Sequence, residues 1–267
     1  MEPLSSFLGI HIIYDRVKRV LTMDVEQKII DMFKSHPEID KVPTHWTPLP
    51  TKGSKPSTPS ATVQRYVRVH YASIVGAFIY IAISCRPDLA HGVGILARHM
   101  HGPTATAVDN CIHLCGYLKN PAVQRMKLEY CVQDNRVKAH IAQQHGDRTG
   151  ALHAYSGPLN GVDDCPLAVY SDATLSGPFE DQCKATSGLV IFHLFMLIAW
   201  MSKLQPFTVA STHNAELLAL ALAADECMWL RRTIDELWFC YPTFVYSDNK
   251  HPPTIVDITE DDGIVDG

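Results

Sequence analysis

The tetrapeptide Val169-Tyr170-Ser171-Asp172 occurs a second time as Val245-Tyr246-Ser247-Asp248. Each copy ends a run of β-branched and aromatic residues, which is typical of a buried strand. Between the copies, residues 213–238 carry the apolar spacing of one long helix, with Glu216 in its first turn. Two strands that end in aspartate and a helix that presents a glutamate can bring three carboxylates to one edge of a sheet. This pattern decides the predicted fold.

Three neighbouring carboxylates repel one another unless cations lie between them. Mg²⁺ and Mn²⁺ prefer oxygen ligands, and a pair of such ions can activate a water and stabilise the leaving oxygen in phosphodiester hydrolysis. We therefore predict that Asp172, Glu216 and Asp248 hold two Mg²⁺ or Mn²⁺ ions and are the catalytic residues. An aspartate after a strand is also common turn chemistry, so a structural role is the alternative.

The segment around the repeat predicts an α/β layer. Further strands are expected over residues 188–194 and 197–202, followed by the long helix and then by the strand that ends in the second copy. The upstream half is predicted to be mostly helical. Its helices are expected over residues 72–84, 89–100 and 104–118, after two short strands (7–13 and 17–23), a first helix from residue 24 and a proline-rich linker or extended loop (43–59).

Charge is unevenly distributed along the chain, whose net charge is -5. Residues 1–61 carry 8 Lys and Arg against 7 Asp and Glu, residues 62–150 carry 10 against 5, and residues 151–267 carry 5 against 16. A basic segment beside an acidic one fits a phosphate-holding surface next to a cation site. Two ordinary solvated surfaces are the alternative.

The cysteines and the apolar runs indicate a soluble protein of a reducing compartment. The eight cysteines form no CxxC pair, so we expect buried thiols rather than disulfides. Cys111, His113 and Cys115 suggest a zinc corner, but their spacing is not that of a common structural zinc site. The apolar runs 72–83 and 188–200 are shorter than the roughly 20 residues that span a bilayer, and the start lacks a signal peptide.

Several motifs, in order, resemble the RNase H domain of copia-type LTR retrotransposons. They are residues 168–173 (AVYSDA), 184–188 (KATSG), 198–206 (IAWMSKLQP), 210–220 (ASTHNAELLAL), 229–232 (WLRR) and 246–249 (YSDN). Upstream, residues 71–76 (YASIVG) and 86–88 (RPD) resemble the connection between polymerase and RNase H in the same Pol polyproteins. Residues 7–10 (FLGI) resemble the primer grip. The resemblance extends, with gaps, from about residue 7 to residue 249.

The resemblance implies an RNase H-like mixed sheet with one long helix, preceded by a mostly helical thumb and connection region. The implied parts are a primer-grip and thumb remnant with a proline-rich linker (1–61), a helical connection region (62–150), a C-terminally incomplete RNase H-like domain (151–251) and an acidic tail (252–267). The family's metal-binding acids fall on Asp172, Glu216 and Asp248. The implied activity is hydrolysis of the RNA strand of an RNA–DNA hybrid, with two metal ions, beside other segments of a Pol polyprotein. No membrane partner is implied, and the expected location is a cytoplasmic particle or the nucleus.

Two departures from the family pattern leave the activity open. The family continues with a fourth acid and a histidine, for which the candidates are Asp257, Glu260, Asp261, Asp262 and His251. Val162-Asp163-Asp164 is interpreted as a loop, so the chain is not expected to polymerise DNA by itself. The alternatives to an active nuclease are an inactive nucleic-acid-binding remnant and a decayed retroelement sequence.

Overall fold

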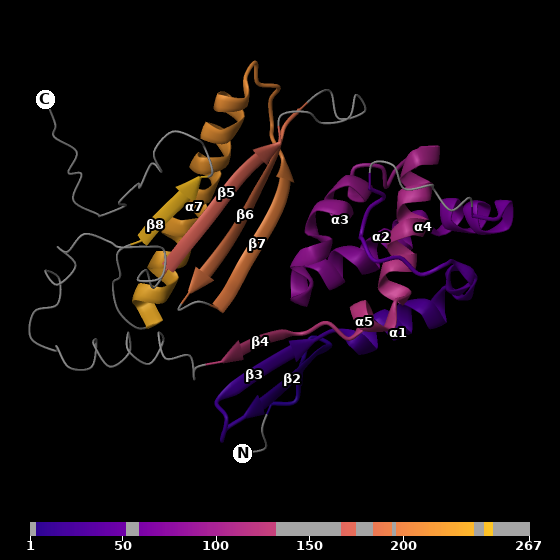
Figure 1. The fold of residues 1–267 in the computed structure, drawn as a ribbon, viewed down its shortest axis with the longest axis horizontal. Helices are drawn as coiled ribbons and strands as arrows, with labels where there is room; N and C mark the ends of the chain where they lie inside the picture. Colours follow the sequence, from indigo (N-terminus) through magenta and orange to yellow (C-terminus); the bar gives the residue numbers. More distant parts are fainter. Residues whose placement is uncertain are drawn as a thin grey trace, which may run out of the picture. The chain divides into compact units, whose positions relative to one another are not determined.

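The structure is a computed structural model that describes residues 4–51, 59–131, 167–174, 184–193, 196–237 and 243–247. The chain combines helices with two sheets, which agrees with the predicted α/β class (Figure 1). It divides into two compact units, Met1–Tyr130 and Cys131–Gly267. The predicted boundaries at residues 61 and 150 stay predictions, and each unit is described separately below.

The first unit combines a small sheet with a group of helices (Figure 1). The strands lie in the order β1-β2-β3-β4, and β1–β2 and β2–β3 are antiparallel. The strands are β1 (Ser6–Phe7), β2 (Ile10–Asp15), β3 (Val20–Asp24) and β4 (Leu128–Cys131). The helices are α1 (Glu26–Ser35), η1 (Pro37–Lys41), α2 (Ala61–Cys85), η2 (Pro87–Leu89), α3 (Ala90–Ala97), α4 (Ala105–Lys119) and α5 (Pro121–Gln124).

Capping residues set the starts of the two longest helices in this unit. The Ser60 hydroxyl accepts a hydrogen bond from the Val63 amide at the start of α2 (3.4 Å), and the Thr104 hydroxyl accepts one from Ala107 at the start of α4 (3.1 Å). Helix α4 therefore begins within one residue of the predicted start at residue 104. Helix α2 begins 11 residues before the predicted residue 72, because Val63 and Val67 extend its buried face into a polar stretch of sequence.

By length and composition α2 could cross a membrane, which the prediction missed by counting residues 72–83 alone. Its 25 residues include Val67, Ile74 and Phe78, each fully buried in the core of the first unit. The core helix of a folded domain passes the same test of length and apolar composition, so this feature carries little weight.

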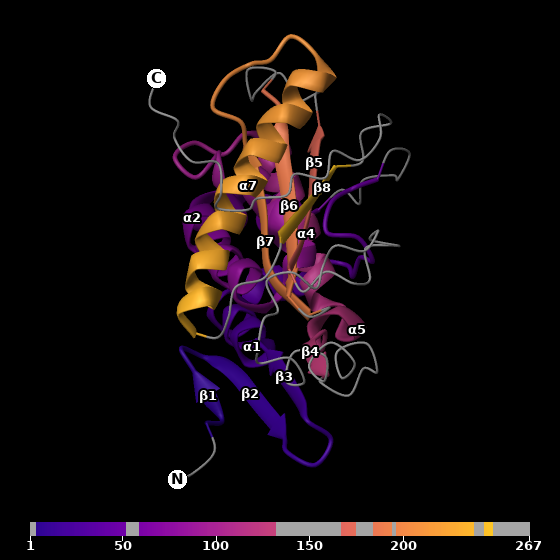
Figure 2. The same cartoon turned by 90° about the vertical axis from the view of Figure 1, so that its left-hand side faces the viewer.

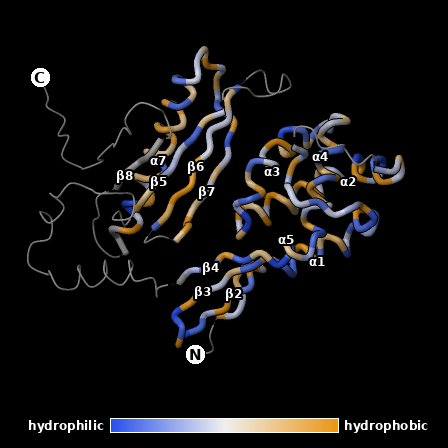
Figure 3. Tube along the Cα trace, viewed as in Figure 1, coloured by the Kyte–Doolittle hydropathy of each residue, from blue (hydrophilic) through white to orange (hydrophobic). Residues whose placement is uncertain are grey.

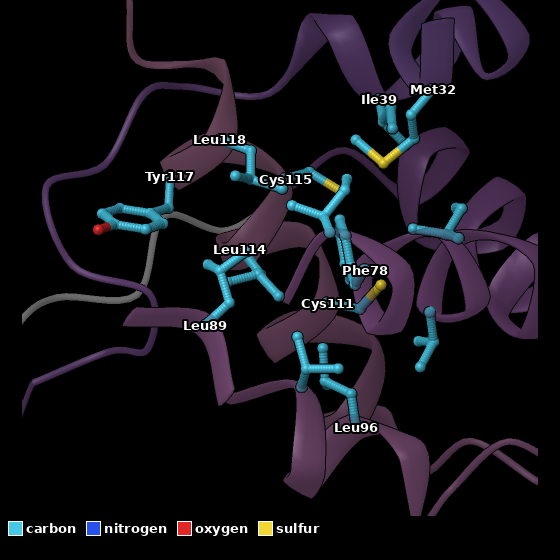
Figure 4. Packing of buried hydrophobic residues seen from close by; sticks show 14 of the residues in the cluster. Met32, Ile39, Phe78, Leu89, Leu96, Cys111, Leu114, Cys115, Tyr117 and Leu118 are labelled. Carbon is cyan, nitrogen blue, oxygen red and sulfur yellow. The ribbon is translucent and has the colours of Figure 1, made fainter. Parts of the chain in front are cut away.

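One continuous core joins α1, η1, α2, α3 and α4. Figure 4 shows Cys111 and Cys115 of α4 beside Phe78 of α2, and Leu114 beside Leu89. The cysteines whose side chains are described are buried free thiols, as predicted: Cys85, Cys111, Cys115 and Cys227. Burial and the neighbouring Cys115 raise the pKa of Cys111 well above its ordinary value, so this thiol is protonated at neutral pH.

The start of the predicted linker is docked against α4. We call residues 42–51 the strap. The His45 amide donates to the Gly116 carbonyl (3.0 Å), and a His113 ring nitrogen lies 3.0 Å from the Thr47 carbonyl oxygen. The His45 and His113 rings stack at 3.9 Å with 10° between their planes. A Cβ at Gly116 would lie 2.2 Å from the Pro43 carbonyl oxygen, so glycine is needed for this approach.

Acidification is expected to destabilise the first unit. Burial lowers the pKa of His45, and burial together with the neighbouring His45 lowers that of His113, from an ordinary value of 6.5. The unfolded chain therefore takes up protons near pH 6.5 that the folded chain resists, so the free energy of unfolding falls below that pH. Urea titrations between pH 7.5 and 5.5 measure this loss. His113→Phe keeps a ring for stacking and should weaken the pH dependence, whereas the exposed His101→Gln should not; equal slopes in all three proteins would contradict the expectation.

The second unit is a sheet with one long helix on one face (Figures 1 and 2). The sheet has the order β7-β6-β5-β8, in which β5, β6 and β7 are antiparallel and β8 is parallel to β5. The elements are β5 (Leu167–Thr174), β6 (Thr186–His193), β7 (Met196–Leu204), α7 (Thr212–Leu237) and β8 (Thr243–Ser247). Their bounds agree with the predicted strands and helix to within a few residues.

The core of the second unit lies between the sheet and α7. Leu167 and Val169 of β5 and Leu189 and Ile191 of β6 are buried with Ala223 and Cys227 of α7. Figure 3 shows the hydrophobic stretch along β6, the strand between β5 and β7. Every second residue of β5 faces the helix, as the period of two in a strand requires.

Several predictions concern residues outside the described part of the chain. These are Asp248, the candidates for a fourth acid and a histidine (Asp257, Glu260, Asp261, Asp262 and His251), the loop at residues 162–164 and the acidic tail at 252–267.

Candidate metal-binding and catalytic site

The two copies of the repeated tetrapeptide lie side by side in the sheet. Parallel pairing of β5 with β8 puts Val169 opposite Val245, Tyr170 opposite Tyr246 and Ser171 opposite Ser247. Ser171 and Ser247 are the residues that immediately precede Asp172 and Asp248 in the chain. Asp248 itself lies outside the described residues. The structure therefore aligns the two strands in the register that the prediction requires, up to the last described residue.

Helix α7 makes the parallel pairing possible. Parallel neighbours cannot be joined by a tight turn, because the chain must return to the starting end of the sheet. At about 1.5 Å per residue, a helix of 26 residues spans about 39 Å, enough to return the chain along the whole sheet. The helix starts at a polar cap, where the Ser211 hydroxyl accepts from the Asn214 amide (3.2 Å).

Asp172 lies near the end of β5 and is exposed. The residues on either side, Ser171 and Ala173, are buried. Its partner on β6 is Gly188, whose lack of a side chain leaves space: a Cβ there would be no closer than 3.9 Å to the Asp172 carbonyl oxygen. Asp172 is thus held by a rigid strand while its carboxylate stays accessible.

Glu216 is the fifth residue of α7 and is 7 % exposed. Its chain neighbour Ala215 is fully buried in a small cluster with Ala173 and Ala185, together with Ala219. These short side chains let the start of the helix approach the strands closely. Because Ala173 follows Asp172 and Ala215 precedes Glu216, the structure brings together the two segments that carry these acids.

A buried carboxylate is stable only when hydrogen-bond donors or cations compensate for the water that it has lost. The predicted donor set is entirely carboxylate, which suits Mg²⁺ or Mn²⁺ and not zinc. No group of three His, Cys, Asp or Glu side chains able to hold a metal ion occurs among the described residues, which do not include Asp248. The three-acid metal site therefore stays a prediction.

One polar residue beside this site belongs to the motif at residues 198–206, but its role was not predicted from the sequence. Gln205, just after β7, is 3 % exposed, and its side-chain amide donates to the Ser187 hydroxyl (2.9 Å) and to the Ala215 carbonyl (2.8 Å). A glutamine between a strand and a proline looks like part of an ordinary loop, because only the fold brings its two acceptors to the same place.

Comparison with known proteins shows what the chain is similar to. It is 27 % identical over 255 residues, 94 % of its length, to the retrovirus-related Pol polyprotein from transposon TNT 1-94 of Nicotiana tabacum. It is 26 % identical over 254 residues to that from transposon RE2 of Arabidopsis thaliana. It spans 17 % and 15 % of the length of these two relatives.

A shorter protein is also similar to part of the chain. The secreted RxLR effector protein 161 of Plasmopara viticola is 30 % identical over 166 residues, which are 61 % of this chain and 92 % of that protein. No protein-family model matches the chain, and no solved structure matches it. The match to the transposon proteins covers both units, from the strands of the first to those of the second. Over about 93 % of its length the chain is thus similar to the retrovirus-related Pol polyproteins of copia-type transposons.

Proposed function

We propose that the second unit is the RNase H-like part of a transposon Pol polyprotein, which hydrolyses the RNA strand of RNA–DNA hybrids during reverse transcription. The observation that carries this proposal is the parallel, in-register pairing of β5 with β8. It directs two strands to the same edge of one sheet: β5, which carries Asp172 near its end, and β8, which Asp248 follows in the chain. The packing of Ala215, at the start of α7, against Ala173 supports the inclusion of Glu216 in the proposed site.

In this proposal Asp172, Glu216 and Asp248 hold two Mg²⁺ or Mn²⁺ ions. When bound, such ions lower the pKa of an attacking water and stabilise the charge of the leaving oxygen. The chain's own contribution is rigidity. Asp172 is fixed by a strand with neighbours on both sides and Glu216 by a capped helix, so little conformational freedom is lost when substrate binds.

The proposed substrate class follows from the resemblance of the second unit to the RNase H domain of copia-type Pol polyproteins. A hybrid duplex is held mainly through its backbone and its 2′-hydroxyl groups, which requires positive charge more than base-reading side chains. Residues 62–150 carry 10 Lys and Arg against 5 Asp and Glu, and Arg65 and Arg68 are exposed on α2. We therefore propose that this segment contributes positive charge for binding the hybrid, and that other Pol segments act beside it.

Incubation of the purified chain with an RNA–DNA hybrid tests the proposal. The RNA strand and the DNA strand carry different fluorophores, and parallel reactions contain Mg²⁺, Mn²⁺ or EDTA. We expect cleavage of the RNA strand alone, with either metal ion and not with EDTA. Single-stranded RNA and duplex DNA are the substrate controls and should stay intact.

Two other outcomes would favour one of the alternatives, an inactive nucleic-acid-binding remnant or a decayed retroelement sequence. Hybrid binding without metal-dependent cleavage would overturn the nuclease proposal in favour of a non-catalytic nucleic-acid-binding remnant. Absence of both binding and cleavage, in a chain that unfolds without a cooperative transition, would instead identify a decayed sequence.

A further inference from the structure

Gln205 occupies a buried position between two elements of the proposed site. Its side-chain nitrogen donates to the Ser187 hydroxyl (2.9 Å) and to the Ala215 carbonyl (2.8 Å), and its backbone amide donates to the Ala185 carbonyl (2.8 Å). The side-chain oxygen is buried and makes no hydrogen bond to the described residues. The hydrogen bonds of this side chain are therefore made by its amide nitrogen, Nε2.

Both acceptors are close to the proposed metal-binding acids, Ser187 through strand pairing and Ala215 along the chain. Ser187 pairs with Ala173 in the β5–β6 ladder, one position after Asp172. Ala215 immediately precedes Glu216 in α7. One amide group thus connects the strand next to β5 with the backbone of the helical turn that carries Glu216.

The Ala215 carbonyl is a sensitive point for such a connection. The first turns of a helix have few tertiary restraints and fray easily, and a carbonyl oxygen can accept a side-chain hydrogen bond in addition to its backbone bond. The contacts around Ala215 are made by the short side chains of Ala173, Ala185 and Ala219, which do not define one orientation of the helix start. A buried hydrogen bond is directional, so it fixes the orientation of this turn more tightly than alanine packing can.

We propose that Gln205 is a positioning residue for Glu216: by tying the Ala215 carbonyl to Ser187, it sets the direction of the Glu216 carboxylate relative to β5. This inference rests on the proposed function, because positioning matters only if Glu216 takes part in metal binding. Gln205 touches neither metal nor substrate in this account. Its effect reaches the site through the backbone of α7.

Gln205→Met is the decisive variant, because methionine has nearly the same length and volume but lacks the donor. Hydrogen exchange of the amides of residues 212–219 is expected to become about 10-fold faster, the change that corresponds to loss of one buried hydrogen bond. Amides of residues 222–234 should keep their rates. Ser187→Ala, which leaves the bond to Ala215 in place, should give a smaller change, and Gln64→Met, which removes the exposed hydrogen bond from Gln64 to Asp109, should give none.

The second measurement is the Mn²⁺ concentration that gives half-maximal hybrid cleavage. We expect Gln205→Met to raise it about 10- to 100-fold, the usual effect of losing a group that orients a metal ligand, with little change in KM for the hybrid. Faster exchange with an unchanged metal requirement would overturn the inference, since Gln205 would then be purely structural, and unchanged exchange would overturn it directly. If the unaltered chain does not cleave, the proposed function itself fails, which is a different result.

Discussion

Replacement of Asp172 by asparagine is expected to lower the rate of hybrid cleavage about 10²- to 10³-fold, the loss typical when one preorganised electrostatic group of an active site is removed. Asparagine has the size and shape of aspartate but carries no negative charge, so it holds a divalent cation weakly. Because Asp172 is exposed, the substitution should change the free energy of unfolding by no more than about 0.5 kcal/mol. Initial rates with a labelled hybrid, together with urea titrations, separate the two effects.

Asp225→Asn is the matched control. Asp225 is also an exposed aspartate of the second unit, but it lies in the middle of α7, more than two turns beyond Glu216. Cleavage by this variant should equal that of the unaltered chain. Equal activity of the Asp172 and Asp225 variants would show that the observed nuclease is a contaminant or that Asp172 is not a ligand, and in either case the assignment would fall.

Replacement of Arg86 by alanine is expected to lower the free energy of unfolding of the first unit by about 1.5–3 kcal/mol, because it removes a buried guanidinium whose hydrogen bonds to a charged group join several elements. Arg86 has a side chain that is 1 % exposed. It donates twice to the Asp88 carboxylate, at 2.8 and 2.7 Å, and once to the Val123 carbonyl at 3.0 Å. The Tyr117 hydroxyl also donates to Asp88 (2.9 Å), and burial together with Asp88 raises the pKa of Tyr117 to about 12.

This buried pair links three separate parts of the first unit: the turn after α2, helix α4 and the short helix α5. Loss of the guanidinium would leave the Asp88 carboxylate with the Tyr117 hydroxyl and would leave the Val123 carbonyl without its side-chain donor. Hydrogen exchange of α4 amides in increasing urea reports the stability of this unit. Asp88→Asn should destabilise it at least as much, since it leaves the buried Arg86 charge without a counter-ion.

Arg125→Ala provides the comparison with a surface ion pair. Arg125 has a side chain that is 73 % exposed and lies 3.8 Å from Glu26, so its removal should cost less than about 1 kcal/mol. If Arg86→Ala cost no more than Arg125→Ala, the buried pair would not be the main connection between these helices.

Patterns within short stretches of the chain predicted most elements correctly. The spacing of apolar residues located α4, α7 and the strands β5 to β8, because helices and strands that bury one face must repeat every 3.6 or every two residues. The start of α2 was not predicted, because its first turns bury only Val63 and Val67 and the residues around these two are mostly polar.

Such local patterns did not predict contacts between residues that are far apart in the chain. Residues 86–88 lie between two predicted helices (72–84 and 89–100), yet they also form an ion pair whose other partners, Tyr117 and Val123, come some 30 residues later. The strap was predicted as a linker because prolines favour extended chain, whereas its docking depends on the absence of a Cβ at Gly116. No local sequence pattern identifies Tyr117 and Val123 as partners of residues 86–88, or Gly116 as the partner of the strap.

For the candidate site, the sequence by itself determined the family resemblance and the identities of the proposed acids, Asp172, Glu216 and Asp248. The doubled tetrapeptide and the motifs around it are local features, and a local feature is readable without a fold. Only the tertiary structure decided that the two copies pair in parallel and in register, and that Gln205 joins β6 to the start of α7. Strand register and buried hydrogen bonds depend on which segments pack together, and that choice is made by the whole core rather than by any one stretch of the chain.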